Sequence, residues 1–239
     1  MTTLLLATRN RGKKREIEDF LNSGGLLPSP PRWGPSGPPR REPSGLGTFR
    51  ALPLREPSGP STGTFRALRL LSLVDVDAGE DAEESGKTFA ENARLKADHY
   101  SRRTGLDTLG DDSGLEVHAL DGRPGVRSAR YAGAGAGDDA RIEKLLAEMR
   151  DIQDRRARFV SAVCVSRNGS PLASFVGEVA GEILFEKRGG GGFGYDPLFL
   201  YPPLGKTFAE LSLVEKNRVS HRARALEQVR AFIQAGGLG

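Results

Sequence analysis

A segment rich in proline, glycine and arginine, between residues 22 and 66, limits the folds open to this chain more than any other feature. It contains an imperfect direct repeat, which runs from Arg41 to Leu52 and again from Arg55 to Leu68. Two short copies cannot build a repeat fold. Few apolar groups among many prolines also cannot offset the entropy of ordering the chain. We therefore expect residues 1–239 to form a single domain that is interrupted by a disordered insertion at 22–66.

The positive charge of the chain is concentrated in the same segment. The formal net charge is +4 over 239 residues, and the isoelectric point is about 9.4. Between Arg32 and Arg69, seven arginines and two glutamates carry a net charge of +5, which leaves about −1 for the remaining residues. The globular part is therefore not expected to bind nucleic acid. An RNA-binding module carried by the basic insertion stays open as an alternative.

The sequence predicts neither membrane insertion nor secretion. No apolar run approaches the roughly 20 residues that span a bilayer, and the first residues lack the basic region of a secretory signal. The single cysteine, Cys164, lies in an apolar run and has no partner for an intramolecular disulfide. A reducing, cytoplasmic location is the resulting expectation.

Apolar patterns predict strands and helices on both sides of the insertion. Asn168-Gly169, between two alternating runs, is a strong hairpin signal. Thr88 and Glu91 form a capping box at a helix start, and Gly105 ends that helix. The expected strands cover residues 3–7, 68–76, 115–120, 159–165, 172–179 and 181–185. The expected helices start near Lys13, at Thr88, at a cap provided by Asp138 and within 215–222, where Ser220 is a plausible cap.

Two adjacent carboxylates, Asp111 and Asp112, separate two apolar runs. Ser113-Gly114 follows them and is expected to turn the chain into the second run. Neighbouring side chains on an extended backbone point to opposite faces, so one carboxylate can face a cavity while the other braces the turn. A carboxylate at a strand end suits Mg²⁺ or can accept a proton from water. Turn composition alone explains the pair equally well.

The first predicted strand leads through a polar loop into a helix. Free backbone N–H groups and the positive end of a helix dipole favour a phosphate in such a position, and Lys13 adds a mobile charge. The spacing is not that of a P-loop, and a solvated helix start is the alternative interpretation. The candidate ligands in this loop are Thr8, Arg9, Asn10, Arg11, Gly12 and Lys13.

Three later segments also contain candidate site residues. The glycines from 189 to 192 allow close approach of the backbone to a flat ligand, and Phe193 and Tyr195 offer stacking faces. Lys96 lies beside the inward stripe of its helix and can either snorkel to solvent or reach a phosphate. By itself, His221-Arg222 at a helix start is more typical of a solvated face.

Taken together, six segments resemble the inosine triphosphate pyrophosphatase family, which removes non-standard purine nucleoside triphosphates. They occur in the family's order and cover nearly all of the chain outside the insertion. They are Leu-Ala-Thr8-x-Asn10-x-Gly12-Lys13, Glu84-Ser-Gly-x-Thr-Phe-x-Glu-Asn-Ala-x-Leu-Lys96-Ala, Asp111-Asp-Ser-Gly-Leu-Glu-Val, Pro124-Gly-Val-x-Ser-Ala-Arg-Tyr131, Gly192-Phe-Gly-Tyr-Asp-Pro197 and Glu215-Lys-Asn-x-x-Ser-His-Arg222.

The resemblance implies an α/β fold with a long, mixed, twisted sheet, flanking helices and two lobes around a central nucleotide cleft. It also implies a homodimer that uses Mg²⁺ and cleaves ITP, dITP or XTP between the α- and β-phosphates, giving a monophosphate and pyrophosphate. Pyrophosphatases for other modified nucleotides remain the alternative within enzymes.

The resemblance also assigns roles to residues. Asp112 would hold the metal ion and orient or deprotonate the attacking water, and Glu83 or Glu84 would complete the metal site. The triphosphate contacts would be Thr8, Asn10, Lys13, Lys96 and Ser113, with Arg130 as a further candidate. The base pocket would use Phe193, Gly194, Tyr195 and Asp196 as a wall, with Lys216, His221 and Arg222 reading the purine edge. Arg9 departs from the family pattern, which usually has a small or neutral residue there; it could add phosphate affinity or face solvent.

Overall fold

A mixed seven-stranded sheet organises the protein, and the computed structural model describes residues 2–22 and 68–238. The predicted insertion at 22–66 lies outside this part of the chain, except for Asn22, which ends the first helix. The strands are β1 (Thr2–Ala7), β2 (Leu68–Ser72), β3 (Thr108–Val117), β4 (Arg156–Arg167), β5 (Ser170–Ile183), β6 (Phe199–Tyr201) and β7 (Lys206–Thr207). The α-helices are α1 (Arg11–Asn22), α2 (Phe89–Thr104), α3 (Asp138–Glu148), α4 (Leu213–Val219) and α5 (His221–Gln234).

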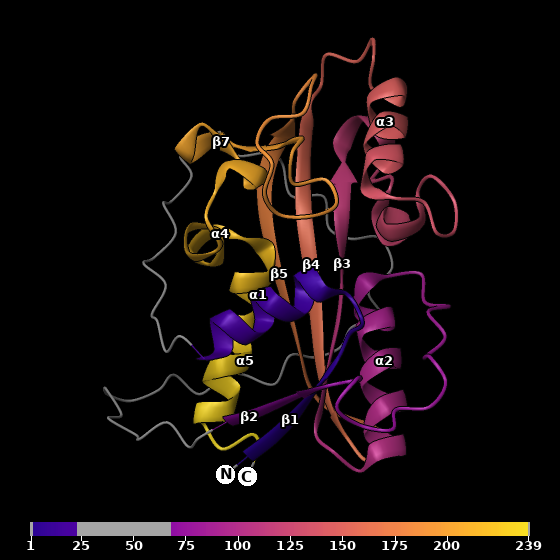
Figure 1. Ribbon diagram of the computed structural model, residues 1–239, viewed down its shortest axis with the longest axis vertical. Helices are drawn as coiled ribbons and strands as arrows, with labels where there is room; N and C mark the ends of the chain where they lie inside the picture. The colour runs from indigo at the N-terminus through magenta and orange to yellow at the C-terminus, as the bar shows by residue number, and fades with distance from the viewer. Residues whose placement is uncertain (1, 23–67, 239) are drawn as a thin grey trace.

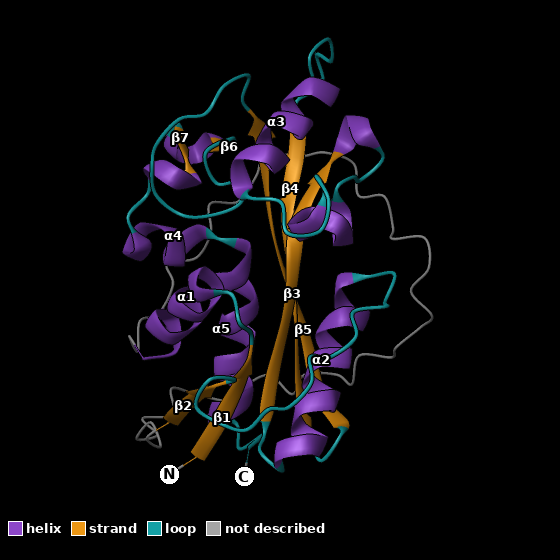
Figure 2. Ribbon diagram, turned by 45° about the vertical axis from the view of Figure 1, so that its right-hand side comes forward, coloured by secondary structure: helices purple, strands orange, loops and turns teal. Residues whose placement is uncertain are grey.

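The strand order is β2-β1-β3-β4-β5-β6-β7. β1 runs parallel to both of its neighbours, whereas β3 to β7 pair antiparallel. The long strands β3, β4 and β5 extend along the length of the molecule, with α1, α4 and α5 on one side and α2 and α3 on the other (Figure 1; Figure 2). This arrangement confirms the predicted α/β fold with a mixed sheet and flanking helices.

Two main apolar clusters pack the two ends of the long strands. One joins Leu4 on β1 and Ile17 on α1 to Leu226 on α5, and all three side chains are buried. The other joins Leu115 on β3 to Leu145 on α3 and to the aromatic side chains around Phe208. The same strands therefore serve two cores, and the expected two-lobed arrangement follows from this division.

The local signals for α2 and the β4–β5 hairpin are confirmed. The Thr88 side chain accepts a hydrogen bond from Glu91 N, the Glu91 side chain accepts one from Thr88 N, and Gly105 ends the helix with a φ of 70°. Asn168 and Gly169 have φ values of 50° and 77°, which suits a two-residue turn between paired strands.

Several predicted boundaries are wrong. The run 181–185 is not a separate strand, because β5 continues without interruption to Ile183. The strand expected over 68–76 ends at Ser72, where the Asp75 carboxylate accepts hydrogen bonds from the Ser72 backbone and hydroxyl. The helix expected from Asp138 is capped by Gly137, and Asp138 is its first residue. The last helical region is two helices, and Ser220 ends α4 while it caps α5.

The predicted turn at Ser113-Gly114 is also wrong. Both residues lie inside β3, which runs straight through the Asp111-Asp112 pair and stays paired with β4. The glycines beside the pair are required by packing. A Cβ atom on Gly110 would lie 2.2 Å from the Ala93 carbonyl oxygen on α2, and one on Gly114 would lie 2.3 Å from the Ser128 hydroxyl.

Within residues 2–22 and 68–238, no helix is both long and apolar enough to cross a membrane.

We predict that Gly110→Ala destabilises the protein by about 1–3 kcal/mol, because the added methyl group would force α2 away from β3. The Ala93 carbonyl and the Ala97 amide, which it would meet, are helix backbone and cannot rotate away. Urea unfolding measures the effect. Gly190→Ala is the matched control, since within the described residues its methyl group would meet no atom within 4 Å beyond its own chain neighbours. Equal midpoints for the two variants would show that α2 does not pack closely on Gly110.

Candidate active site

A cleft of about 360 Å³ opens between the two ends of the sheet, a volume suited to a small-molecule ligand. Its walls come from the β1–α1 loop, β3, α2, the segment around Arg130, the glycine-rich loop and the α4–α5 junction. The predicted site residues that line it are Thr8, Arg9, Asn10, Lys13, Glu84, Lys96, Asp112, Ser113, Phe193, Gly194, Tyr195, Asp196, Lys216, His221 and Arg222, and Arg130 lines it as well.

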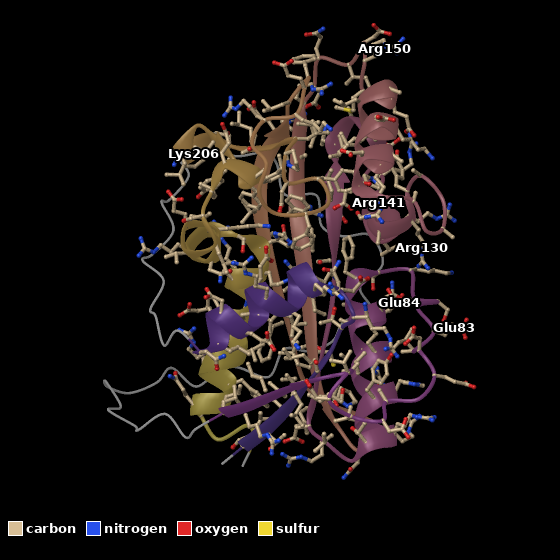
Figure 3. All side chains as sticks on the ribbon, in the orientation of Figure 1. Glu83, Glu84, Arg130, Arg141, Arg150 and Lys206 are labelled. Atoms are coloured by element: carbon tan, nitrogen blue, oxygen red, sulfur yellow. The ribbon has the colours of Figure 1, made fainter. Side chains whose placement is uncertain are left out.

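Three predicted residues do not line the cleft. Arg11 is exposed on the first turn of α1. Gly12 lies behind the wall, where a Cβ atom would be 2.5 Å from the Phe193 ring, so its lack of a side chain lets α1 approach that ring. Glu83 points outward at the margin of the molecule, whereas Glu84 lies closer to the body, near Arg130 (Figure 3).

The β1–α1 loop is held in shape by its own side chains. Asn10 N donates to the Thr8 hydroxyl over 3.2 Å, and the Asn10 side-chain oxygen accepts from Lys13 N over 3.0 Å. The Lys13 ammonium group lies 2.8 Å from the Asp111 carboxylate. The start of α1 and its lysine are therefore already oriented toward β3, which is the arrangement expected of an anion site at a helix N-terminus.

Asp111 and Asp112 project to opposite faces of β3 and have opposite electrostatic surroundings. Burial opposes ionisation of Asp111, but Lys13 and Arg222 prevail and hold its pKa well below the ordinary value. The Ser161 hydroxyl also donates to it over 2.8 Å. Burial has the larger influence on Asp112 and raises its pKa, although Lys96 and Lys13 oppose this. Two carboxylates with pKa values displaced in opposite directions are suited to different roles.

Asp112 belongs to a cluster of charged side chains that includes Glu84, in the acidic loop before α2. The Lys96 ammonium group lies 3.5 Å from Asp112 and 3.3 Å from Glu84, so one cation bridges two carboxylates. The buried Asn92 amide donates to Asp112 over 3.1 Å, and its oxygen accepts from Gly86 N over 2.8 Å. Asn92 thus fixes both the carboxylate and the loop that carries Glu84.

A second buried charge cluster is centred on Glu16. Its carboxylate lies 2.6 Å from the Lys216 ammonium group and pairs closely with the Arg222 guanidinium. Lys216 also contacts Asp196, and Arg222 donates to the Ser113 hydroxyl over 2.7 Å. Burial would raise the pKa of Glu16, but Arg222 and Lys216 lower it instead. These contacts join α1, α4 and α5 to the floor of the cleft.

Phe193 forms the wall above this cluster. The Lys216 ammonium group lies 4.7 Å from the centre of its ring, and Phe193 N donates to the Asp196 carboxylate over 2.9 Å. The next amide, Gly194 N, donates to Asp138 over 2.6 Å. The wall is therefore fixed at both ends, and its ring, which lines the cleft, is an aromatic surface suited to a flat ligand.

His221 and Arg222 correct the expectation of a solvated helix start, because both are nearly inaccessible to solvent, with exposures of 3% and 1%. The His221 ring stacks on Phe159 with 4.7 Å between ring centres. Burial, reinforced by Arg222 and Lys216, lowers the pKa of His221 well below 6.5. Within the described residues its Nδ1 atom has no hydrogen-bond partner, and the residue lines the cleft. A buried, neutral imidazole with a spare polar atom suits a ligand that forms hydrogen bonds.

Two residues of the site were not identified from the sequence. Glu16 falls on the same helical face as Lys13 and Phe20, so the sequence pattern indicates an acidic residue on the inward side of α1. Asn92 occupies the inward face of α2 between Phe89 and Lys96 and could be found in the same way. Neither pattern identifies the distant partner, which depends on the folded chain.

The sequence comparisons point to one family. The profile of the Ham1 family matches residues 58–232. The dITP/XTP pyrophosphatase of Geobacter sulfurreducens is 42% identical over 228 residues, which cover 95% of this chain and 94% of that protein. The dITP/XTP pyrophosphatase of Desulfotalea psychrophila is 49% identical over 165 residues, which cover 69% of this chain and 74% of that protein.

The structural comparison agrees. The solved structure of a HAM1 protein from Coxiella burnetii matches with a TM-score of 0.74 and 33% sequence identity, covering 98% of this chain and all of that chain.

We predict that Glu16→Gln destabilises the protein by about 3–5 kcal/mol, because it leaves the buried Lys216 and Arg222 without their shared countercharge. Urea unfolding at neutral pH measures the effect. Glu18→Gln on the same helix is the control, since the contact of Glu18 with Lys14 at 3.7 Å is partly exposed and the change should alter the free energy of unfolding by less than about 0.5 kcal/mol. Similar midpoints for the two variants would mean that the Glu16 cluster does not stabilise the fold.

We further predict that His221 lowers the stability of the folded protein at acidic pH. Because the folded pKa is lowered, the unfolded chain binds a proton below about pH 6.5 that the folded protein rejects. Stability should therefore fall as the pH decreases, by at most about 1.4 kcal/mol per pH unit from this group. Urea midpoints at pH 7.5 and 5.5 should differ more for wild type than for His221→Gln. Equal differences would contradict a neutral His221.

Proposed function

The chain belongs to the Ham1 family, and on that premise we propose that it hydrolyses non-standard purine nucleoside triphosphates, namely ITP, dITP and XTP, to the monophosphate and pyrophosphate. Such an activity would remove these nucleotides from the precursor pool. The observation that carries the proposal is the division of one cleft into two ends. At one end, the Lys96 ammonium group bridges Glu84 and Asp112. At the other, the Phe193 ring lies against the buried cluster of Lys216 and Arg222.

The triphosphate would lie along the β1–α1 loop. Thr8 and Asn10 offer polar groups and backbone N–H donors at the start of α1, and Lys13 and Lys96 supply positive charge. The Ser113 hydroxyl, which accepts from Arg222, would contact the α-phosphate. A highly charged ligand is favoured here because these cations would neutralise it in a partly dry cleft.

Glu84 and Asp112 would hold Mg²⁺. The fit rests on Lys96, whose ammonium group lies within 3.5 Å of both carboxylates and shows that a cation is accommodated between them. Two carboxylates supplemented by substrate phosphates are a usual coordination set for Mg²⁺. When bound, the ion would neutralise charge that develops on the phosphate oxygens.

Asp112 would orient the attacking water and accept its proton. Its raised pKa makes it a better proton acceptor than an ordinary aspartate, and the Asn92 amide and Ser113 N fix its two oxygens. The water oxygen bonds to the α-phosphorus, the bond from that phosphorus to the bridging oxygen breaks, and pyrophosphate leaves. Asp111 stays ionised and holds Lys13 and Arg222 in place.

The base would stack on Phe193, with its edge toward Lys216, His221 and Arg222. Hypoxanthine and xanthine carry a 6-keto oxygen that accepts hydrogen bonds, whereas adenine has an amine that donates them. Donors left unpaired in a buried site weaken binding strongly, which would select against ATP.

We also propose a homodimer, by analogy with the family, and a cytoplasmic setting, from the single buried cysteine. A pyrophosphatase for other modified nucleotides remains the rival within enzymes.

We predict that Asp112→Asn lowers kcat for ITP by about 10²–10⁴-fold, because an amide cannot accept the proton from water. Pyrophosphate release with Mg²⁺ measures the effect. Asp139→Asn is the control, since Asp139 is exposed and pairs with Lys187 at the surface. Near-wild-type turnover by Asp112→Asn would show that the assigned role is wrong.

Substrate choice is tested separately on the wild-type protein. ITP, dITP and XTP should be hydrolysed with a kcat/KM at least about 10²-fold above that for ATP, because adenine leaves buried donors unpaired. The product should be pyrophosphate and not orthophosphate. Equal rates on ATP and ITP would exclude the inosine assignment, and faster turnover of a modified pyrimidine would favour the rival enzyme.

A further inference from the structure

Arg9 differs from Lys13, Lys96, Lys216 and Arg222 in its exposure and in its partner. Its guanidinium donates to the Asp81 carboxylate over 2.7 Å, and the two side chains are 50% and 68% exposed. Asp81 also accepts from the Tyr100 hydroxyl over 3.2 Å. Arg9 belongs to the loop of Thr8 and Asn10, and Asp81 belongs to the loop of Glu84, so their ion pair connects the two walls of the phosphate end.

Lys13, Lys216 and Arg222 are committed to buried carboxylates. Lys13 is paired with Asp111, whose side chain is 1% exposed. Lys216 and Arg222 share Glu16, whose side chain is 5% exposed. Removing a partner from a buried pair leaves an uncompensated charge, whereas an exposed pair contributes little to stability. Among these cations, Arg9 is therefore the one that an incoming anion can bind with the smallest loss of folding stability.

A terminal phosphate is a stronger partner for Arg9 than Asp81 is. It carries up to two negative charges and three acceptor oxygens, which match the planar fork of a guanidinium group. Asp81 offers one charge and already accepts from Tyr100. Because Arg9 adjoins the residues proposed to hold the triphosphate, the rearrangement requires only that the guanidinium turn into the cleft.

We propose that Arg9 exchanges Asp81 for the terminal phosphate of the substrate and so makes the site selective for nucleoside triphosphates over diphosphates. Asp81 acts as the competitor that holds Arg9 while the cleft is free of substrate. The inference rests on the proposed function for its substrate and deepens it by assigning the selectivity for phosphate-chain length to one residue pair.

The first test compares hydrolysis of ITP and IDP by wild type, Arg9→Ala and Arg15→Ala. Arg9→Ala should lower kcat/KM for ITP by about 10–100-fold, in line with the loss of a charge-assisted hydrogen bond, and for IDP by less than about 3-fold. Arg15 is exposed on α1 outside the cleft, so Arg15→Ala should leave both values unchanged. Equal losses on ITP and IDP would overturn the proposal.

The second test measures binding of inorganic tripolyphosphate by calorimetry and needs neither a base nor turnover. Arg9→Ala should weaken binding by about 10-fold or more. Asp81→Asn should strengthen it by up to about 5-fold, since it removes the exposed competitor. Asp77→Asn, an exposed acid in the same stretch, should change it less than Asp81→Asn does. Weaker binding by Asp81→Asn would show that the pair is a structural clamp and overturn the exchange.

The two tests separate this inference from the proposed function. If wild type releases no pyrophosphate from ITP, the proposed function fails, and the tripolyphosphate measurements still decide whether Arg9 changes partner. If wild type is active but Arg9→Ala binds tripolyphosphate like wild type, the proposed function stands and the exchange is wrong.

Discussion

The shared ion pair of Glu16 with Lys216 and Arg222 is the interaction on which the rest of the site depends. It joins residues about 200 positions apart in the sequence and fixes the N-terminal helix α1 against α4 and α5. Burying these charges is favourable only because each has an opposite charge and further hydrogen bonds. Once Glu16 is in place, Arg222 reaches Ser113 on β3, and Lys216 lies under Phe193. The base end of the cleft is thus a consequence of how α1 packs.

Asp111 and Asp112 show how one strand serves two chemical purposes. They are neighbours with the same side chain, but the alternation of β3 directs them to different surroundings. Two cations stabilise the ionised form of Asp111, whereas burial outweighs the nearby lysines at Asp112. The first carboxylate therefore acts as a fixed countercharge, and the second is left suited to proton transfer. This division depends on the passage of β3 through both residues, and the close approach of α2 leaves no room for a side chain at the neighbouring Gly110.

The elements that could be predicted from the sequence are those set by local chemistry. The capping box of α2 and the turn at Asn168-Gly169 need only neighbouring residues, and both are present. The turn predicted after Asp112 failed because Ser-Gly composition favours turns, whereas here the glycine is demanded by a neighbouring segment. Most of the motif residues do meet in one cleft. The burial of His221 and the partners of Glu16 could not be predicted, because the first depends on stacking against Phe159 and the second on α4 and α5, all of which are distant in the sequence.

The charges of the cleft form a gradient from buried to exposed that matches their roles. Glu16 and Asp111 lie at the buried end, where ion pairs are maintained because breaking them would strand a charge. Lys96, Glu84 and Asp112 are intermediate, with side chains 10–38% exposed, so a ligand can rearrange them without unfolding the site. Arg9 and Asp81 are the most exposed, and their pairing is correspondingly easy to replace. A polyanion that binds in this cleft can therefore replace the exposed ion pairs more easily than the buried ones. Its terminal phosphate would be held by Arg9 once that side chain leaves Asp81, while the base would be read against a rigid wall.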